Sequence, residues 1–304
     1  MACNSYLKER MPDAKALVEE LGKSFEYVSV LGSYNRTKQI TSGSRNTSVE
    51  ETENECGFVV RMFDGKHYSE YSANDIRGLS VQTILEAIEL PELNQEFVDV
   101  KPLKEEEMVK SFVREDAHSL GNEEVLSRLE AIRSFCEKYD ERIINVNAGY
   151  TKREVSKIFV SQKKCLDQYY TWINARLMIV SREGESIKRA YKTQNEADSL
   201  KALEELDEIK ESTSKLAIDM LQATAIEPGE YEIITDPTIT GLIAHEAFGH
   251  GVEMDMFVKK RALGADYIGR RVGSDLVTMH EGAAYSDSVA AYVFDDEGTP
   301  AGDV

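Results

Sequence analysis

The sequence predicts an α+β protein in which mainly antiparallel sheets are flanked by helices. Three features predict this class. The step Asp64-Gly65 separates two runs of strand-forming residues, which is typical of a β-hairpin. Further β-rich runs follow one another between residues 143 and 192, and segments with helical periodicity precede and follow them. Because short turns join antiparallel strands, whereas parallel strands need a long crossover, the sheets are expected to be mainly antiparallel.

The first 110 residues alternate between helical and strand patterns. Apolar residues recur at helical spacing near the N-terminus and again after the hairpin. The predicted elements are, in chain order, helix 12–23, a β-rich stretch 25–40, hairpin strands 56–63 and 67–71, helix 80–90 and a polar connection 94–110. The last segment contains Pro102 and lacks periodicity, so it is expected at the surface.

The next hundred residues predict helices on either side of a set of strands. In segment 122–139, Leu129, Ile132 and Cys136 lie on one helical face, so Cys136 is expected to be a buried thiol. The predicted elements that follow are strands 143–146, 154–161, 169–181 and 187–192, and then one long helix 195–223.

A domain boundary is predicted where Pro228-Gly229 interrupts the helical pattern. Residues 1–225 are expected to form an α+β domain, and residues 226–304 to begin a second, sheet-rich domain. In the second part, residues 231–235 read as a strand. Asp236-Pro237 then predicts a helix start, since Asp is a favoured N-cap and Pro fits the first helical position.

Composition restricts the class of partner and the compartment. The chain has 304 residues, of which 55 are acidic and 36 basic, giving a net charge of −19 that disfavours direct nucleic-acid binding. The basic groups 259–261 and 270–271 are short and are interpreted as solvated faces. No leader-like h-region and no apolar run near ~20 residues is found, so a cytoplasmic protein without membrane spans is expected. Four scattered cysteines predict reduced thiols.

Residues 245–250 read His-Glu-Ala-Phe-Gly-His and are the strongest candidate site. At ~100° per residue, a regular α-helix would place His245 and His250 about 140° apart. A π-bulge would bring both imidazoles to one side, and Gly249 would add backbone freedom there. The apolar residues Ile239 and Leu242 are expected to hold this helix against a core.

Two histidines and a glutamate in this order are typical of zinc peptidases. His245 and His250 are predicted to bind Zn²⁺, and Glu246 to act as the catalytic general base on a zinc-activated water. Such a short motif also occurs by chance, so a pair of structural histidines beside a surface glutamate is the alternative.

Residues 245–255 (His-Glu-Ala-Phe-Gly-His-Gly-Val-Glu-Met-Asp) resemble the active-site stretch of the TldD branch of the TldD/PmbA metallopeptidases, formerly called modulators of DNA gyrase. Residues 269–274 and 295–301 look like further family segments in the same order, and the hairpin 56–71 fits more loosely. The resemblance implies a two-domain TldD/PmbA-like architecture. It also implies zinc ligation by His245 and His250 and a catalytic Glu246. Because the PmbA branch lacks the metal-binding helix, this chain resembles the catalytic partner.

The resemblance also implies a third zinc ligand, a cysteine after the Asp-Asp-Glu-Gly segment, which is expected beyond Val304. The chain is therefore expected to be truncated, and the ligand is carried over to none of its own cysteines. Glu253 and Asp255 are either acceptors for an imidazole N–H or a solvated pair. His280 is a substitute ligand only if the fold brings it close. The remaining histidines, His67 and His118, are assigned no chemistry.

These features together predict a zinc metallopeptidase that cleaves unfolded or extended peptides. By resemblance it is expected to work as a homodimer or with a PmbA-type partner. The alternative is a non-catalytic dimerising or peptide-binding subunit with an incomplete metal site. A third hypothesis, direct action on DNA through gyrase, is disfavoured by the net charge.

Overall fold

The computed structural model describes residues 4–52, 55–88, 101–102, 104–283 and 289–302. Two compact units are distinguished by their internal contacts. Unit 1 comprises the chain up to Ala223 together with Gly282–Gly302, and unit 2 comprises Thr224–Glu281. The division into domains 1–225 and 226–304 stays a prediction.

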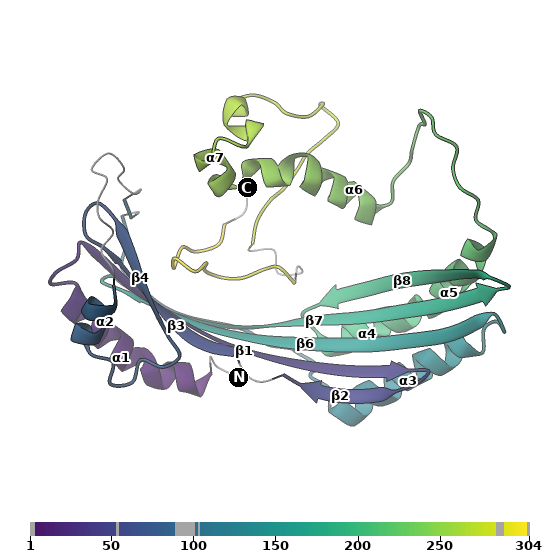
Figure 1. The fold of residues 1–304 in the computed structure, drawn as a ribbon, viewed down its shortest axis with the longest axis horizontal. Helices are drawn as coiled ribbons and strands as arrows, with labels where there is room; N and C mark the ends of the chain where they lie inside the picture. The colour runs from purple at the N-terminus through teal and green to yellow at the C-terminus, as the bar shows by residue number, and fades with distance from the viewer. Residues whose placement is uncertain (1–3, 53–54, 89–100, 103, 284–288, 303–304) are drawn as a thin grey trace. The chain divides into compact units, whose positions relative to one another are not determined.

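Unit 1 is built on one eight-stranded sheet (Figure 1). Its strands are β1 Tyr27–Gly43, β2 Thr47–Glu51, β3 Glu55–Phe63, β4 Tyr68–Ala73, β5 Met108–Arg114, β6 Ile143–Ser161, β7 Lys164–Glu183 and β8 Ser186–Glu196. The strand order is β4-β3-β1-β6-β7-β5, with β2 on β1 and β8 on β7. The β5–β7 pair is parallel and every other pair among the described strands is antiparallel, so the predicted mainly antiparallel α+β fold is confirmed.

The predicted hairpin is formed by β3 and β4, which pair from Phe58↔Ala73 to Phe63↔Tyr68. Asp64 closes the turn because its Oδ1 accepts hydrogen bonds from the backbone N–H groups of Lys66 and His67, both at 2.8 Å. Gly65 has φ +99°, a conformation that other residues rarely adopt. The Asp-Gly step therefore predicts the turn for a physical reason.

The two separate strands predicted at 143–146 and 154–161 are one strand, β6. The intervening residues look like a turn because they are polar or small. In the sheet they continue the alternation: Ala148 and Tyr150 are buried, while Gly149 and Thr151 lie on the opposite face. Strand length is thus set by pairing with β1 and β7 on both sides, which local pattern does not report.

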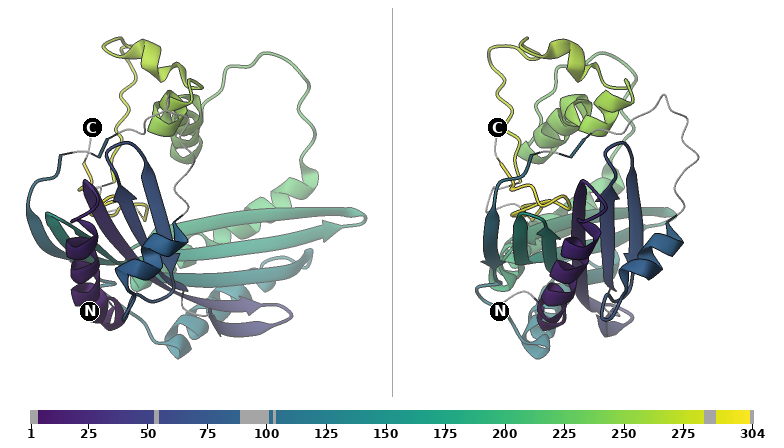
Figure 2. Two further views of the ribbon diagram at one scale, coloured as in Figure 1. Left: turned by 60° about the vertical axis from the view of Figure 1, so that its left-hand side comes forward. Right: turned by 90° about the vertical axis from the view of Figure 1, so that its left-hand side faces the viewer.

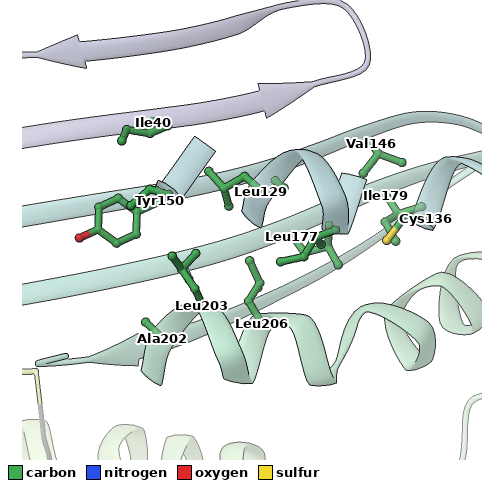
Figure 3. Packing of buried hydrophobic residues seen from close by; sticks show 14 of the residues in the cluster. Ile40, Leu129, Cys136, Val146, Tyr150, Leu177, Ile179, Ala202, Leu203 and Leu206 are labelled. Atoms are coloured by element: carbon green, nitrogen blue, oxygen red, sulfur yellow. The ribbon is translucent and has the colours of Figure 1, made fainter. Parts of the chain in front are cut away.

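Helices cover one face of this sheet (Figures 1 and 2). They are α1 Ser5–Leu21, α2 Val81–Ala87, α3 Asn122–Glu137, α4 Ser199–Glu208 and α5 Lys210–Asp219. One core lies between α3, α4, α5 and the long strands; it includes Leu129, Cys136 and Tyr150 (Figure 3). A second lies between α1, α2 and β1, β3 and β6. Cys136 is buried, as predicted.

The long helix predicted at 195–223 is instead two helices joined at Ile209, and its first residues belong to β8. The carbonyl of Ile209 accepts hydrogen bonds from the hydroxyls of Ser212 (3.0 Å) and Thr213 (2.7 Å) in addition to the helical bond from the N–H of Thr213 (2.9 Å), and such extra bonds often bend a helix. Helix α1 also starts earlier than predicted, with Pro12 inside it. Strand β2 was not predicted.

The predicted surface connection 94–110 is wrong at its end, because Met108 begins β5. Residues 94–100, like the end of the helix predicted at 80–90, lie outside the described residues. Strand β5 is short and lies at the end of the main strand path, and its parallel pairing with β7 depends on a partner more than fifty residues away. Neither alternation nor a flanking turn signals it.

The segment Ala291–Gly302 packs on the sheet face that is opposite the helices. Phe294 is buried against Phe159 and Leu166. The buried side chain of Gln168 donates to the carbonyl of Phe294 (2.8 Å) and accepts from the N–H of Val293 (3.0 Å). Gly298 has φ +67°, and a Cβ there would lie 2.4 Å from the Phe159 ring, so only glycine fits.

Unit 2 consists of short helical segments. They are α6 Pro237–Ala244, a π-helical turn His245–Gly249, a 3₁₀ turn His250–Val252, α7 Met254–Val258 and a 3₁₀ helix Leu263–Tyr267. The strand predicted at 231–235 is absent; these described residues have no regular structure, and Ile233 and Ile234 are exposed. Among the described residues of the whole chain, no helix is both long and apolar enough to cross a membrane.

Candidate metal centre

Helix α6, which leads into residues 245–250, begins where the sequence predicts. Asp236 is the N-cap of α6, and its Oδ1 accepts a hydrogen bond from the N–H of Ile239 at 2.8 Å. Pro237 occupies the first turn, where its missing N–H costs nothing. The start of α6 is therefore determined by side chains that are local in sequence.

The expectation that a core supports this helix is not met by the described residues. Ile239, Leu242 and Ile243 are 44%, 50% and 49% exposed. The apolar stripe is present in the sequence, but a stripe alone does not say which surface covers it.

The predicted π-bulge is confirmed. The backbone N–H of His250 donates to the carbonyl of His245, five residues earlier, so the chain needs five residues for this turn. The two imidazoles lie on the same side, with ring centroids 4.4 Å apart and planes at 65°. Gly249 has φ −54° and ψ −51°, an ordinary helical conformation, so the predicted use of its backbone freedom is wrong.

Three potential ligand groups meet at this turn. One ligand atom each of His245, Glu246 and His250 lies within 4.8 Å of the others, and all three residues are exposed. The Nε2 atom of His250 is 3.7 Å from Oε2 of Glu246. The helical turn thus places two imidazoles and one carboxylate around a single small volume.

Glu253 is the acceptor that orients His250. Its Oε1 lies 2.8 Å from Nδ1 of His250. This hydrogen bond, with the negative charge of Glu253, raises the pKa of His250 above its usual value. With Nδ1–H directed at Glu253, the remaining lone pair of the ring is on Nε2, the atom that faces Glu246. Glu253 is thus an acceptor for an imidazole N–H. Asp255 is not: its carboxylate is exposed and is paired with Lys259 (2.7 Å).

The other candidates do not join this group. Among the described residues, His280 is not part of any three-residue metal-binding cluster. The cysteines Cys56, Cys136 and Cys165 are free and likewise outside the cluster, while Cys3 lies outside the described residues. His118 bonds Asp198 at 2.6 Å, within unit 1.

Beside the cluster is a cavity of about 470 Å³ within unit 2. Glu246 and His250 line one side. Its other walls are mostly apolar and come from Ala247, Phe248, Met256, Leu263, Tyr267 and Val272. Arg261 also lines it. Residues 259–261 are all exposed, as the interpretation of a solvated face expects; that Arg261 also lines this cavity is not visible as periodicity.

The donor set suits a zinc ion. Two neutral imidazoles and a carboxylate are ligands that zinc accepts, and catalytic zinc sites use three protein ligands with one open position. The described residues supply the two imidazoles and Glu246. If Glu246 is the base, a third ligand is not among the described residues.

Residues 228–304 match a protein family described as the PmbA/TldA metallopeptidase C-terminal domain. A metalloprotease of Synechocystis sp. is 26% identical over 178 residues, which are 56% of this chain and 38% of that protein. A TldD homologue of Buchnera aphidicola, also a metalloprotease, is 28% identical over 106 residues, covering 35% of this chain and 22% of its own length. The chain thus spans well under half the length of these relatives.

Two solved structures share the fold. One, from Bacteroides thetaiotaomicron, has a TM-score of 0.74 at 15% identity and covers 97% of this chain and 69% of its own. The other, from Thermotoga maritima, has a TM-score of 0.74 at 15% identity and covers 98% and 68%. Both are described as proposed modulators of DNA gyrase. At this identity the likeness concerns the fold alone.

Proposed function

We propose that this chain, which belongs to the TldD/PmbA metallopeptidase family, carries the catalytic helix of a zinc-dependent peptidase. One observation carries the proposal. The π-helical turn brings His245, Glu246 and His250 together, with ligand atoms within 4.8 Å of one another. An α-helical path would have separated the imidazoles.

His245 and His250 would hold the metal. When bound there, zinc would lower the pKa of a coordinated water and polarise the scissile carbonyl. Glu253 would keep His250 in the tautomer that offers Nε2, since it accepts the hydrogen bond of Nδ1–H. It would also prevent the ring from rotating away.

Glu246 would act as the general base. Its carboxylate is exposed and lies next to His250 Nε2, so it can reach a water at the metal position. It would take a proton from that water as the peptide carbonyl is attacked. It would then donate the proton to the leaving amine, which completes hydrolysis of the peptide bond.

Unfolded or extended peptides are the proposed substrates. The three candidate residues are exposed and lie beside an open cavity, so an extended segment of a peptide can reach them. A dimer, either with itself or with a PmbA-type subunit, is proposed on the basis of the family resemblance. The third zinc ligand would come from outside the described residues. If no such ligand exists, a peptide-binding subunit without catalysis is the second candidate.

The test compares Glu246→Gln with wild type, using protein expressed from its complete reading frame and loaded with zinc. Cleavage of an unstructured peptide is followed by mass spectrometry, and bound zinc by elemental analysis. Glu246→Gln is expected to keep its zinc and lower kcat by about 10²–10⁴-fold, the usual contribution of a general base. His250→Ala is expected to lose zinc. Glu232→Gln, an exposed glutamate of unit 2, is the matched control.

Two results would contradict the proposal. Equal cleavage by wild type and Glu246→Gln would remove Glu246 from the reaction. Zinc binding without cleavage by either protein would favour the non-catalytic subunit.

A further inference from the structure

Arg261 is exposed and lines the cavity beside Glu246 and His250, and its guanidinium forms no hydrogen bond or ion pair with any described residue. Its neighbours in sequence behave differently. Lys259 is paired with Asp255, and Arg271 with Asp275. An exposed cation that has no partner and lies at a mostly apolar cavity is available to bind an anionic group, especially in a chain with a net charge of −19.

The backbone holds Arg261 in a defined turn. Helix α7 ends in a Schellman motif: the N–H of Arg261 donates to the carbonyl of Met256 (2.9 Å), and the N–H of Lys260 to that of Phe257 (3.0 Å). The motif needs a residue with positive φ, usually glycine. Here that residue is Lys260, with φ +53°. A non-glycine residue in this conformation costs roughly 1–2 kcal/mol, so the turn is maintained against a local penalty.

A close backbone contact ties this turn to the metal helix. Gly264 is buried, and a Cβ at this position would lie 2.4 Å from the carbonyl oxygen of Gly251. It would also lie 3.0 Å from the ring of Phe257. Gly251 directly follows His250. The loop that begins with Arg261 therefore packs against the residue next to a proposed zinc ligand, and only glycine allows this approach.

We propose that Arg261 binds a carboxylate of the peptide substrate while the apolar walls of the same cavity hold the neighbouring side chain. The inference rests on the proposed peptidase function. Arginine suits this role because its planar guanidinium can form two parallel hydrogen bonds with a carboxylate. The cavity also contains the carboxylate of Glu246, so an anionic substrate group is favoured near Arg261 and disfavoured near Glu246. This asymmetry orients the peptide.

Two carboxylates of a peptide share this chemistry: the C-terminal carboxylate and the side chain of Asp or Glu. The first source would make the enzyme act near peptide C-termini. The second would make it select acidic residues within a chain. Four fluorescein-labelled probes separate the sources: Ala-Phe-Leu-Ala-Phe with a free C-terminus, the same peptide as its amide, and two amides in which the central Leu is Glu or Gln.

Binding of the four probes is measured by fluorescence anisotropy with metal-free Glu246→Gln protein, so that no probe is cleaved. Arg261→Gln and Arg261→Lys are each made in this background. Arg270→Gln is the matched control, because Arg270 is also exposed and unpaired among the described residues but does not line the cavity.

We expect one carboxylate probe to bind about fivefold to tenfold more tightly than its neutral counterpart. A gain in affinity of this size is typical of one partly exposed hydrogen bond between charged groups. Arg261→Gln should abolish this preference, Arg261→Lys should keep part of it, and Arg270→Gln should keep all of it. Absence of a preference, its survival in Arg261→Gln, or equal loss in Arg270→Gln would overturn the inference.

Failure of the peptidase proposal is seen separately. If the carboxylate preference depends on Arg261 but no zinc-dependent cleavage is found, the binding site stands and the peptidase proposal fails. If cleavage depends on Glu246 but no carboxylate preference is found, the peptidase proposal stands and the role of Arg261 fails.

Discussion

The two units of this protein reach a defined geometry by different means. In unit 1, long strands and amphipathic helices enclose two cores of fully buried side chains. In unit 2, Gly264 alone is buried among residues 224–281, leaving aside Val258, whose side chain is not described. The candidate metal site is nevertheless well formed. A functional constellation can thus be shaped by backbone hydrogen bonds and caps without a core of its own.

The difference also separates the consequences of mutation. Side chains in unit 1 contribute mainly through burial, so replacing them changes the free energy of unfolding. Side chains of unit 2 are mostly exposed, so replacing them should change metal and peptide binding more than stability. The predictions below test this division.

The largest expected effect comes from a matched pair of Leu→Ala changes in helices. Leu129 in α3 is fully buried, whereas Leu242 in α6 is 50% exposed. Leu129→Ala leaves a cavity between α3 and the sheet and should lower the free energy of unfolding by about 3 kcal/mol. Leu242→Ala should lower it by less than about 1 kcal/mol. Chemical denaturation followed by circular dichroism measures both.

If Leu242→Ala lowers the free energy of unfolding as much as Leu129→Ala, the contrast between a buried unit 1 and an exposed unit 2 is wrong for α6. The apolar side of α6, formed by Ile239, Leu242 and Ile243, would then be covered in the working protein. The expectation that a core holds this helix would be restored.

Features determined by neighbours in sequence were predictable here. The hairpin at Asp64, the N-cap at Asp236 and the π-helical turn all follow from residues a few positions apart. The π-helical turn is the clearest example, because the spacing of His245 and His250 is compatible with a shared site only if the helix widens.

Features determined by distant partners were not predictable. The length of β6 depends on β1 and β7, and β5 is a strand only because β7 pairs with it. The role of Arg261 depends on the close contact of Gly264 with Gly251, which no periodicity reports. Pairing across the chain overrides local pattern in each case.

A smaller effect is expected at the turn that carries Arg261. Lys260→Gly removes the strain of the positive φ but makes the unfolded chain more flexible, so the net gain should be at most about 1 kcal/mol. Hydrogen exchange at the Arg261 amide, which is bonded to Met256, should slow by up to about fivefold. Lys259→Gly, at a helical position with φ −75°, is the control and should not slow exchange. Faster exchange in Lys260→Gly would mean that the lysine side chain itself stabilises the turn.

The smallest predicted effect is a pH dependence in unit 1. His118 bonds Oδ2 of Asp198, while Oδ1 of the same carboxylate caps α4 through the N–H of Leu200 (3.0 Å). The hydrogen bond to Asp198, and the negative charge of this residue, raise the pKa of His118 above its usual value. A raised folded pKa means that the protonated form favours folding.

This contribution is fully present below the unfolded pKa of about 6.5 and is lost as pH rises through the raised folded value. Wild type should therefore exceed His118→Gln in stability at about pH 5.5, and the difference should shrink towards pH 9. Denaturation curves at both pH values measure it, with His280→Gln, in the exposed part of unit 2, as the control. A difference that stays constant with pH would mean that His118 contributes through packing rather than charge, and the ion pair would add nothing to the cap of α4.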